Sequence, residues 1–458
     1  MLTQAMVEGA IGRAMGNERL SAEQFAALQQ EKLRRLLRVA VEKSPLYAEL
    51  YAAIDVDTVP LAELPTTSKP LVQERFDDAV TDRRLTFDGV RRFCEDEEAA
   101  GSPFYLGEFA VMLSSGTTGQ RGFFVMDGPA LADACAVGFR QSNRQPPRAG
   151  PPPKQRIAAV MLIERFDAAG LLMRMIPDAV GEKRLIDIRR GRDEIVRELN
   201  EFQPTLLSSF PYMLRMLADA AAAGRLTISP GRITSSGDVL TASDRAAVRQ
   251  AFGVQPLDYY CSTEAPYLAW ESEAHDGLYV NADYYLVESV DHENRPVGAG
   301  CLGDKLLMTN LTNHTMPLIR YEMSDQVAFT SDAGSLGGPL PRIRTVAGRF
   351  EHTLVLPGRE GGEVSLIPEH IDEFVGGLDG VANYQVIQDR PTQLLVNYIV
   401  QAPADGAAVG KNILAGLRAC FQRYDVAHDV QVQLKPVETL VPIRPGSNKV
   451  CHYWNRCR

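Results

Sequence analysis

Residues 157–163 read IAAVMLI, an apolar run with none of the alternation expected of a strand that has one wet face. Continuous apolar runs of this length are typical of strands buried on both faces of a parallel sheet. We therefore expect a central strand here, with helices covering both sides of its sheet.

After this run, short apolar stretches alternate with segments of helical spacing. Strands are expected at 184–188, 205–209, 232–236 and 254–260, and helices over 192–202, 211–224 and 241–252. Such alternation predicts a parallel sheet flanked by helices. Ligands in these sheets gather at the carboxyl ends of the strands. The loops at 208–212, 235–239 and 261–265 are therefore candidate site segments.

The flanking regions predict further elements and a division into two domains. Ser21 and Gln24 form a capping box that begins a helix reaching about residue 43. Residues 279–290 and 305–309 are expected to be antiparallel strands. The predicted fold class is α/β, with a large N-terminal domain (1–347) of helix-flanked, mostly parallel sheets and a small C-terminal α+β domain (348–458).

Length, charge and cysteine usage narrow the class of protein. The chain has 458 residues, a formal net charge of −10 and seven scattered cysteines. Two or three domains are expected, and the acidic balance argues against a nucleic-acid partner. No stretch has the roughly 18 apolar residues of a membrane span, and no secretory signal is recognisable. We expect a cytoplasmic protein with reduced thiols and no membrane partner.

Residues 111–125 (VMLSSGTTGQRGFFV) place a loop rich in hydroxyls and glycines between two apolar runs. Glycines allow tight turns, and successive amides in such a loop form a concavity that binds anions. The loop lacks the ending of a Walker P-loop. A polyphosphate site is favoured, with an ordinary polar hairpin turn as the alternative. The candidate phosphate-binding residues are Ser114, Ser115, Gly116, Thr117, Thr118 and Gly119.

Three later segments combine with this loop: 259–264 (YYCSTE), 317–325 (PLIRYEMSD) and Gly348-Arg349. Together with Lys69 near the start, the set resembles the adenylate-forming superfamily of acyl-CoA ligases, and more narrowly its phenylacetate–CoA ligase branch. The resemblance runs from about residue 25 to the C-terminus. It implies a distorted antiparallel barrel-like part, a C-terminal lid that moves, and the use of ATP, Mg²⁺ and coenzyme A. It also implies that the protein can form a homodimer.

The resemblance assigns nucleotide-binding roles to residues of these segments. Glu264 would hold Mg²⁺, which commonly uses one or two protein carboxylates and substrate phosphates. Tyr260 would stack on adenine. The alternatives are a surface glutamate and a core tyrosine. The remaining ATP- or AMP-binding candidates are Ser262, Thr263, Asp325 for the ribose, and Arg349 at the hinge, with Glu351 in the acidic place after it.

Three cations need separate explanations. Arg121 stands near the loop where family members carry lysine, and its planar fork would grip phosphate; the alternative is a solvated arginine. Lys449, in the loop 444–449 (RPGSNK), matches the family's catalytic lysine and would oppose developing charge; the alternative is a mobile tail. Arg320 sits in an apolar segment and needs a paired charge. A structural ion pair with Glu322 or Asp325 would supply it.

Two sets of cysteines and histidines are weaker metal candidates. They are Cys451, His452 and Cys457, and Cys261 with His275 and Cys301, and neither has the spacing of paired zinc ligands. Cys261 is expected to be a packing residue rather than a nucleophile.

The strand-end loops supply the candidate acid pocket. Its aromatic residues suit an aryl or arylacetic acid, with core packing as the alternative. We expect activation of this acid by ATP to an acyl-adenylate, followed by transfer to coenzyme A. The rivals are transfer to a carrier protein or an amine, and a catalytically silent nucleotide-binding protein. The acid-binding candidates are Phe210, Tyr212, Ser236, Gly237 and Tyr259, with Phe124 nearby.

Overall fold

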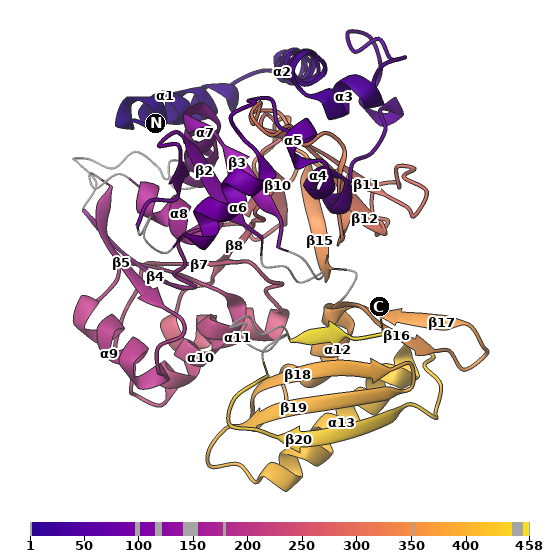
Figure 1. The fold of residues 1–458 in the computed structure, drawn as a ribbon. Helices are drawn as coiled ribbons and strands as arrows, with labels where there is room; N and C mark the ends of the chain where they lie inside the picture. Colours follow the sequence, from indigo (N-terminus) through magenta and orange to yellow (C-terminus); the bar gives the residue numbers. More distant parts are fainter. Residues whose placement is uncertain are drawn as a thin grey trace.

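A nine-stranded mixed sheet forms the centre of the larger body in Figure 1. The structure is a computed structural model that describes residues 2–96, 101–114, 121–140, 154–176, 180–349, 352–441 and 452–457. None of the helices in these ranges is long and apolar enough to cross a membrane. In spatial order the strands of the large sheet are β14 (Asp325–Thr330), β15 (Arg342–Arg349), β10 (Leu278–Val280), β9 (Ala269–Glu271), β8 (Leu257–Tyr260), β7 (Arg232–Ser236), β6 (Leu206–Ser209), β4 (Gln155–Met161) and β5 (Gly181–Asp187).

The parallel half of this sheet confirms the expected alternation of strand and helix. Strands β5, β4, β6, β7 and β8 run parallel. Residues of β4 face both sides, as its apolar sequence predicted. Ala158 and Val160 pack with the helices α9 (Arg192–Phe202), α10 (Pro211–Ala222) and α11 (Ala242–Phe252). Ile157 and Met161 pack on the opposite face, with Met173 of α8 (Ala168–Met175).

The single strand expected over 279–290 is wrong, because the chain turns in its middle. Asn281 and Asp283 are buried, and both accept hydrogen bonds from Arg140 Nη1, at 2.8 and 2.9 Å. This turn leaves β10 in the large sheet. It sends β11 (Tyr285–Val290) into a separate sheet with β12 (Lys305–Asn310) and β13 (Tyr321–Met323).

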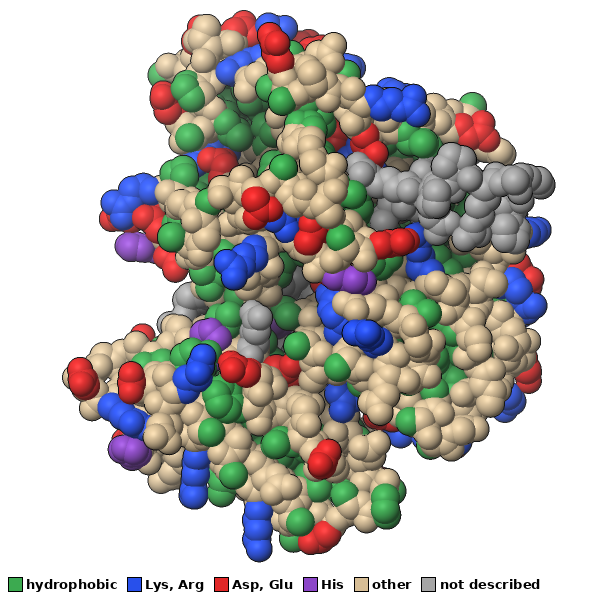
Figure 2. Space-filling view, turned by 180° about the vertical axis from the view of Figure 1, so that it is seen from behind, with side chains coloured by type: hydrophobic (Ala, Val, Ile, Leu, Met, Phe, Trp, Pro, Cys, Tyr) green, Lys and Arg blue, Asp and Glu red, His purple; other side chains and the backbone are tan. Residues whose placement is uncertain are grey.

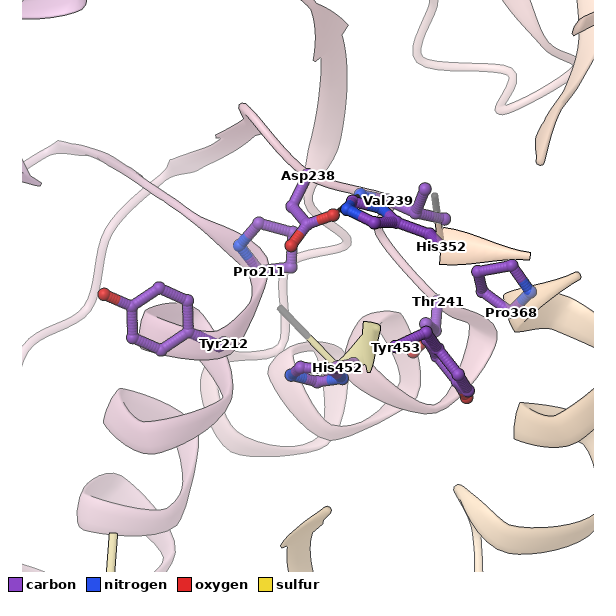
Figure 3. Close-up of a pocket in the computed structure, with 9 residues that line it drawn as sticks. All are labelled: Pro211, Tyr212, Asp238, Val239, Thr241, His352, Pro368, His452 and Tyr453. Carbon is purple, nitrogen blue, oxygen red and sulfur yellow. Dashed lines mark hydrogen bonds between the residues drawn. The ribbon is translucent and has the colours of Figure 1, made fainter. Parts of the chain in front are cut away.

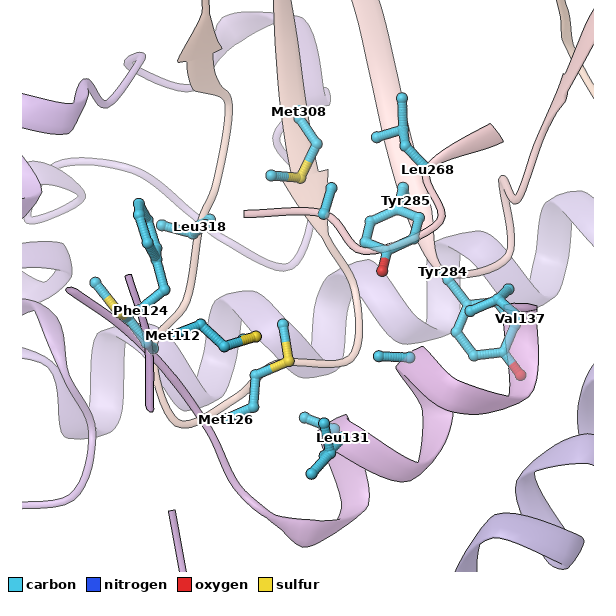
Figure 4. Packing of buried hydrophobic residues seen from close by; sticks show 14 of the residues in the cluster. Met112, Phe124, Met126, Leu131, Val137, Leu268, Tyr284, Tyr285, Met308 and Leu318 are labelled. Atoms are coloured by element: carbon cyan, nitrogen blue, oxygen red, sulfur yellow. The ribbon is translucent and has the colours of Figure 1, made fainter. Parts of the chain in front are cut away.

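That separate three-stranded sheet is open, and the described residues contain no closed barrel, so the expected barrel-like part is an open sheet. A second three-stranded sheet joins β1 (Phe104–Tyr105), β2 (Phe109–Leu113) and β3 (Phe123–Met126). The core between these sheets and α7 (Gly128–Phe139) includes Met112, Phe124 and Met308 (Figure 4). Phe124 therefore packs in the core, which was the alternative to a place near the acid pocket.

Helices of the N-terminal region lie on the larger body, the first three of them at its top in Figure 1. The Ser21–Gln24 capping box is present, and its helix ends at Lys43 as expected. Helix α4 begins at Lys69 and lies against β3 through Gln73. These helices are α1 (Gln4–Asn17), α2 (Ala22–Lys43), α3 (Pro45–Leu50), the 3-10 turn η1 (Leu61–Glu63), α4 (Lys69–Glu74), α5 (Phe76–Ala79) and α6 (Phe87–Glu95).

The elements after β15 pack into a smaller body with its own apolar core (Figure 1). Helices α12 (Pro368–Val375) and α13 (Gly406–Arg423) cover a four-stranded sheet of order β20-β19-β18-β21. A boundary after residue 347 stays a proposal; β15, in the large sheet, ends at Arg349. The strands of this body are β16 (Leu354–Pro357), β17 (Glu363–Leu366), β18 (Val381–Arg390), β19 (Gln393–Val400), β20 (Gln431–Pro436) and β21 (Tyr453–Asn455).

Candidate functional site

The base of the hydroxyl- and glycine-rich loop is closed by hydrogen bonds between its two ends. Ser114 donates its backbone N–H to the Gly122 carbonyl at 3.0 Å, and the Gly122 N–H donates to Ser114 Oγ at 2.8 Å. β2 and β3 pair antiparallel directly behind this closure. Residues 115–120, which hold the other phosphate-binding candidates, lie outside the described residues. Their roles stay predictions.

Helix α4 holds the same loop base from the side. Lys69 Nζ donates to Ser114 Oγ at 2.9 Å. Gln73 accepts from the Phe123 N–H at 2.7 Å and donates to the Phe123 carbonyl at 3.1 Å. A Cβ at Gly122 would lie 2.9 Å from Lys69 Cε, so a larger residue there would push the lysine side chain aside. Lys69 belonged to the residues that carry the resemblance, but no role in the site was expected of it.

The segment before α4 runs beside the start of β13 and the residue before it, Arg320. Thr67 donates its N–H to the Arg320 carbonyl at 3.1 Å and accepts from the Glu322 N–H at 2.8 Å. The segment that leads to Lys69 is therefore adjacent to 317–325, one of the segments that carry the resemblance, and Lys69 itself reaches the loop base. The sequence did not predict this contact, because the two segments are about 250 positions apart.

Arg121 is the loop cation that the sequence predicted, and the structure places it in solvent. Its side chain is 58% exposed, and its guanidinium lies 3.9 Å from the Glu164 carboxylate. This environment matches the solvated alternative in the conformation described. A role in gripping phosphate stays a prediction.

Glu264 occupies a tight turn after β8. The Ser262 N–H donates to the Ala265 carbonyl at 3.3 Å, and the Ala265 N–H donates to Ser262 Oγ at 3.0 Å. Asn310 donates to the backbone carbonyl of Glu264 at 3.4 Å. Among the described residues, no hydrogen bond or ion pair engages the half-buried Glu264 carboxylate. A carboxylate at this place fits a Mg²⁺ ligand, because Mg²⁺ commonly binds one or two protein carboxylates together with substrate phosphates.

Tyr260 and Thr263 flank this turn. Tyr260 is buried in the main apolar cluster, which matches the core alternative, and Thr263 is half-buried. We still predict that Tyr260 contacts adenine. Contacts of Ser262 and Thr263 with the nucleotide are predictions as well.

Asp325 and Arg349 are direct partners across β14 and β15. The ribose-binding and hinge candidates thus sit side by side at the edge of the large sheet. This pairing is one of backbone register. The Arg349 side chain, Glu351 and Lys449 lie outside what the structure describes, so their roles stay predictions.

The Arg320 guanidinium forms a buried structural ion pair, but with a different partner from those expected. Its Nε and Nη2 donate to Glu288 at 3.0 and 3.1 Å, and its Nη1 donates to the Leu64 carbonyl at 2.5 Å. Glu322 instead lies 3.2 Å from Lys305. Glu288 stands on β11, which follows the turn that the sequence did not predict.

The acid-pocket candidates lie at or just after the carboxyl ends of three neighbouring strands, β6, β7 and β8. Ser236 and Tyr259 are direct partners on β7 and β8. The rings of Phe210 and Tyr212 are parallel, with centroids 6.2 Å apart. Gly237 has a φ of +84°, and a Cβ there would lie 2.7 Å from Phe210 Cε1. The structure therefore gathers these residues along the edge that the carboxyl ends of the strands form. Their contact with an acid stays a prediction.

A small pocket lies beside this edge, where the two bodies meet (Figure 3). Tyr212 and Asp238 line it from the larger body, and His352, His452 and Tyr453 line it from the smaller one. His452 is 9% exposed, and its Nε2 is buried without a hydrogen-bond partner in the described structure. Viewed from behind, the surface is notched between the two bodies (Figure 2).

The alternative metal sites gain no support from the described residues. They contain no group of three or more His, Cys, Asp or Glu side chains arranged to hold a metal ion. Cys451, one of the candidates, lies outside them. Burial raises the pKa of the Cys261 thiol to about 12. The thiol therefore stays protonated, as a packing residue would.

The chain is similar in sequence to several ligases. No family model matches the chain. Phenylacetate-coenzyme A ligase of Thermus thermophilus is 26% identical over 397 residues, which are 81% of this chain and 80% of that protein. The enzyme of the same name from Escherichia coli is 25% identical over 395 residues, 81% of each chain. Fumarate–(S)-2,3-diaminopropanoate ligase of Enterobacter agglomerans is 28% identical over 171 residues, 36% of this chain and 42% of that protein.

Solved structures share the fold. A crystal structure of 2-hydroxyisobutyryl-CoA ligase in its postadenylation state superposes with a TM-score of 0.71 and 16% identity, covering 92% of this chain and 87% of that one. The same ligase in its thioesterification state gives a TM-score of 0.56 and 16% identity, covering 96% and 91%. The chain has the fold of adenylate-forming acyl-CoA ligases.

Proposed function

We propose that this chain is an AMP-forming acid–thiol ligase of the adenylate-forming superfamily. It activates a carboxylic acid with ATP to an acyl-adenylate, releasing pyrophosphate, and transfers the acyl group to coenzyme A, releasing AMP. The observation that carries this proposal is similarity along almost the whole chain. Ligases named for this reaction align over four-fifths of both sequences, and a CoA ligase fold covers more than nine-tenths of the chain.

The residues of the loop base support the first half-reaction. Ser114 and the amides that follow it would hold the phosphates of ATP, and Lys69 would bring positive charge to the same hydroxyl. Preorganised cations and donors of this kind stabilise charge that develops on a phosphoryl group. Glu264 would hold Mg²⁺, which would neutralise charge on the phosphates, and Asp325 would accept hydrogen bonds from the ribose hydroxyls.

Lys449 would join the site from the smaller body. In this proposal its ammonium group bridges the attacking carboxylate and the α-phosphate during adenylation. The smaller body, the proposed lid from residue 348 onward, then rotates so that the thiol reaches the acyl group. Arg349, paired with Asp325 across the sheet, would lie at the point of rotation.

The proposed acid is an aryl or arylacetic acid. The parallel rings of Phe210 and Tyr212 and the close approach of Phe210 to Gly237 support a flat apolar binding surface. The relatives named phenylacetate-coenzyme A ligase point the same way.

A second acceptor class is favoured by one observation. The relative named fumarate–(S)-2,3-diaminopropanoate ligase carries an amine acceptor in its name, and it aligns with about a third of this chain. Transfer of the acyl group to an amine or to a carrier-protein thiol is therefore the alternative second half-reaction. A cytoplasmic location and a homodimer remain predictions.

Carboxylate-dependent exchange of labelled pyrophosphate into ATP, run with Mg²⁺ and a panel of aryl, arylacetic and short aliphatic acids, tests the first half-reaction. We expect exchange with at least one aromatic acid and its loss in Lys449→Ala. Adding coenzyme A should yield a thioester. Exchange without thioester, but with amide on adding a diamine, would favour the alternative. No exchange with any acid would point to a silent nucleotide-binding protein.

A further inference from the structure

One buried carboxylate of the smaller body is bonded to a helix of the larger body. Asp372, on α12, is 4% exposed. Its Oδ2 accepts the backbone N–H of Ser243 at 3.1 Å, and its Oδ1 accepts Ser243 Oγ at 2.7 Å. Tyr384, on β18, donates its hydroxyl to the same Oδ1 at 2.8 Å. Three donors therefore converge on one carboxylate, two of them from across the interface.

Ser243 lies in the first turn of α11, where backbone N–H groups lack partners within the helix. Thr241, the N-cap residue, accepts the Asp244 N–H at 3.2 Å, and Asp372 takes the N–H of Ser243. A carboxylate at this end also opposes the positive pole of the helix dipole. The smaller body thus completes the cap of a helix that belongs to the larger body.

The surrounding contacts fit this bond closely. A Cβ at Gly376 would overlap Asp372 Oδ1 and would lie 2.6 Å from Ser243 Oγ, so only glycine allows α12 to approach. Arg215 of α10 donates to the carbonyl of Val381, the first residue of β18, at 3.1 Å. The Tyr453 hydroxyl bonds to that of Tyr384. The contact is polar, as in interdomain interfaces that separate in use.

The bond belongs to one arrangement of the two bodies. Rotation of the smaller body would remove both Ser243 donors from Asp372 and would leave the Ser243 N–H without its cap. The chain superposes better on the postadenylation state of 2-hydroxyisobutyryl-CoA ligase than on its thioesterification state, with TM-scores of 0.71 and 0.56. The arrangement that contains the bond is therefore closer to the first of these states.

We propose that Asp372 is a positioning residue of the first half-reaction, and that its bonds to Ser243 hold the smaller body in the arrangement that precedes its rotation to the thioester-forming one. This inference rests on the proposed function. Breaking the latch, which we define as Asp372 and Ser243, shifts the two bodies toward other arrangements. Adenylation then slows, whereas the thioester step does not.

The test measures the half-reactions separately in Ser243→Ala, Asp372→Ala and Gly376→Ala. Asp405→Ala is the matched control. Asp405 is likewise a capping aspartate, but it is exposed and caps α13 within the smaller body, and no interaction of the described residues joins it to the larger body. We expect carboxylate-dependent pyrophosphate exchange to fall about tenfold in the three latch variants. Thioester formation from supplied acyl-adenylate and coenzyme A should be unchanged or faster. The control should behave as the wild type in both assays.

Equal losses in both half-reactions, or no loss in either, would overturn the latch. If the wild type exchanges with no acid, the proposed function fails first. Small-angle X-ray scattering then decides the latch alone. The radius of gyration should rise in Ser243→Ala and Gly376→Ala and stay at the wild-type value in Asp405→Ala. An unchanged radius in all variants contradicts the proposal.

Discussion

Lys69 Nζ lies 2.9 Å from Ser114 Oγ, the first hydroxyl of the candidate phosphate loop. The same oxygen accepts the N–H of Gly122 from the other end of the loop, at 2.8 Å. A lysine from α4 therefore contacts the point where the loop closes. The loop lacks the lysine that the resemblance implies, and Arg121, the substitute expected from the sequence, is mostly exposed. Lys69 is the better-placed cation.

Lys69→Ala should lower carboxylate-dependent pyrophosphate exchange by about 100-fold, the loss typical of removing one charge-stabilising donor. Arg121→Ala should lower it less than about threefold, because an exposed, loosely paired arginine contributes little. Steady-state exchange rates at saturating acid and ATP give the comparison.

Lys69→Arg separates charge from shape in the same assay. It keeps the charge but brings a planar fork past Gly122, where space beside the lysine stem is tight. Partial activity is expected. If Arg121→Ala proves the more damaging change, the loop arginine is the phosphate cation and Lys69 is structural.

Gly237→Ala should raise the KM for the acid and leave the KM for ATP near its wild-type value. The new methyl group would meet Phe210 Cε1 at 2.7 Å, which displaces the ring from the candidate acid pocket. Gly224→Ala is the matched control, since Gly224 also has a positive φ, but a methyl group there would have no neighbour within 4 Å. Both variants should lose about 1 kcal/mol of stability. Equal KM values for the acid in both variants would place the pocket elsewhere.

Glu288→Gln should destabilise the protein by about 3 kcal/mol, because it leaves the buried Arg320 guanidinium without its counter-ion. Glu322→Gln should cost less than about 1 kcal/mol, because Glu322 pairs with the partly exposed Lys305. Urea unfolding followed by fluorescence measures both. A larger loss for Glu322→Gln would restore the pairing that the sequence suggested.

Regular elements were readable from the sequence because their signals are local. The capping box at Ser21 and the apolar run at 157–163 depend on neighbours within a few residues. The parallel sheet with helices on both faces followed from the alternation of such signals, but the order of its strands was not predicted. What failed was the strand at 279–290, whose turn depends on Arg140, more than 140 positions upstream.

The site was readable only in part, for the same reason. Glu264 and Asp325 follow strands and could be placed at strand ends from the sequence. The contact of Lys69 with Ser114 and that of Asp372 with Ser243 join segments 45 and 129 positions apart. No periodicity marks such pairs, so their residue types alone provided no signal.

Asp258 provides a pH-dependent test of the large sheet. Burial, followed by the repulsion of Glu271, raises the pKa of its carboxyl to about 7. Arg245 offsets this only in part, because its guanidinium donates to Glu271 at 2.9 Å. Asp238 adds further repulsion, and Asp258 Oδ1 has no hydrogen-bond partner in the described structure. The folded protein therefore keeps a proton that the unfolded chain releases near pH 4.

The sign follows from this difference in bound protons. The contribution of Asp258 to the free energy of unfolding is largest below pH 4. It falls as pH rises toward 7, because the carboxyl loses its proton in the unfolded state before it does so in the folded state. Asp258→Asn cannot lose a proton there, so it should be more stable than the wild type by about 1–2 kcal/mol at pH 8, a value reduced for partial solvent screening. The two should have equal stability near pH 4. Urea unfolding across this range, with the exposed Asp379→Asn as control, measures the difference. A constant gap between Asp258→Asn and the wild type at every pH would show that packing, not the proton, separates them.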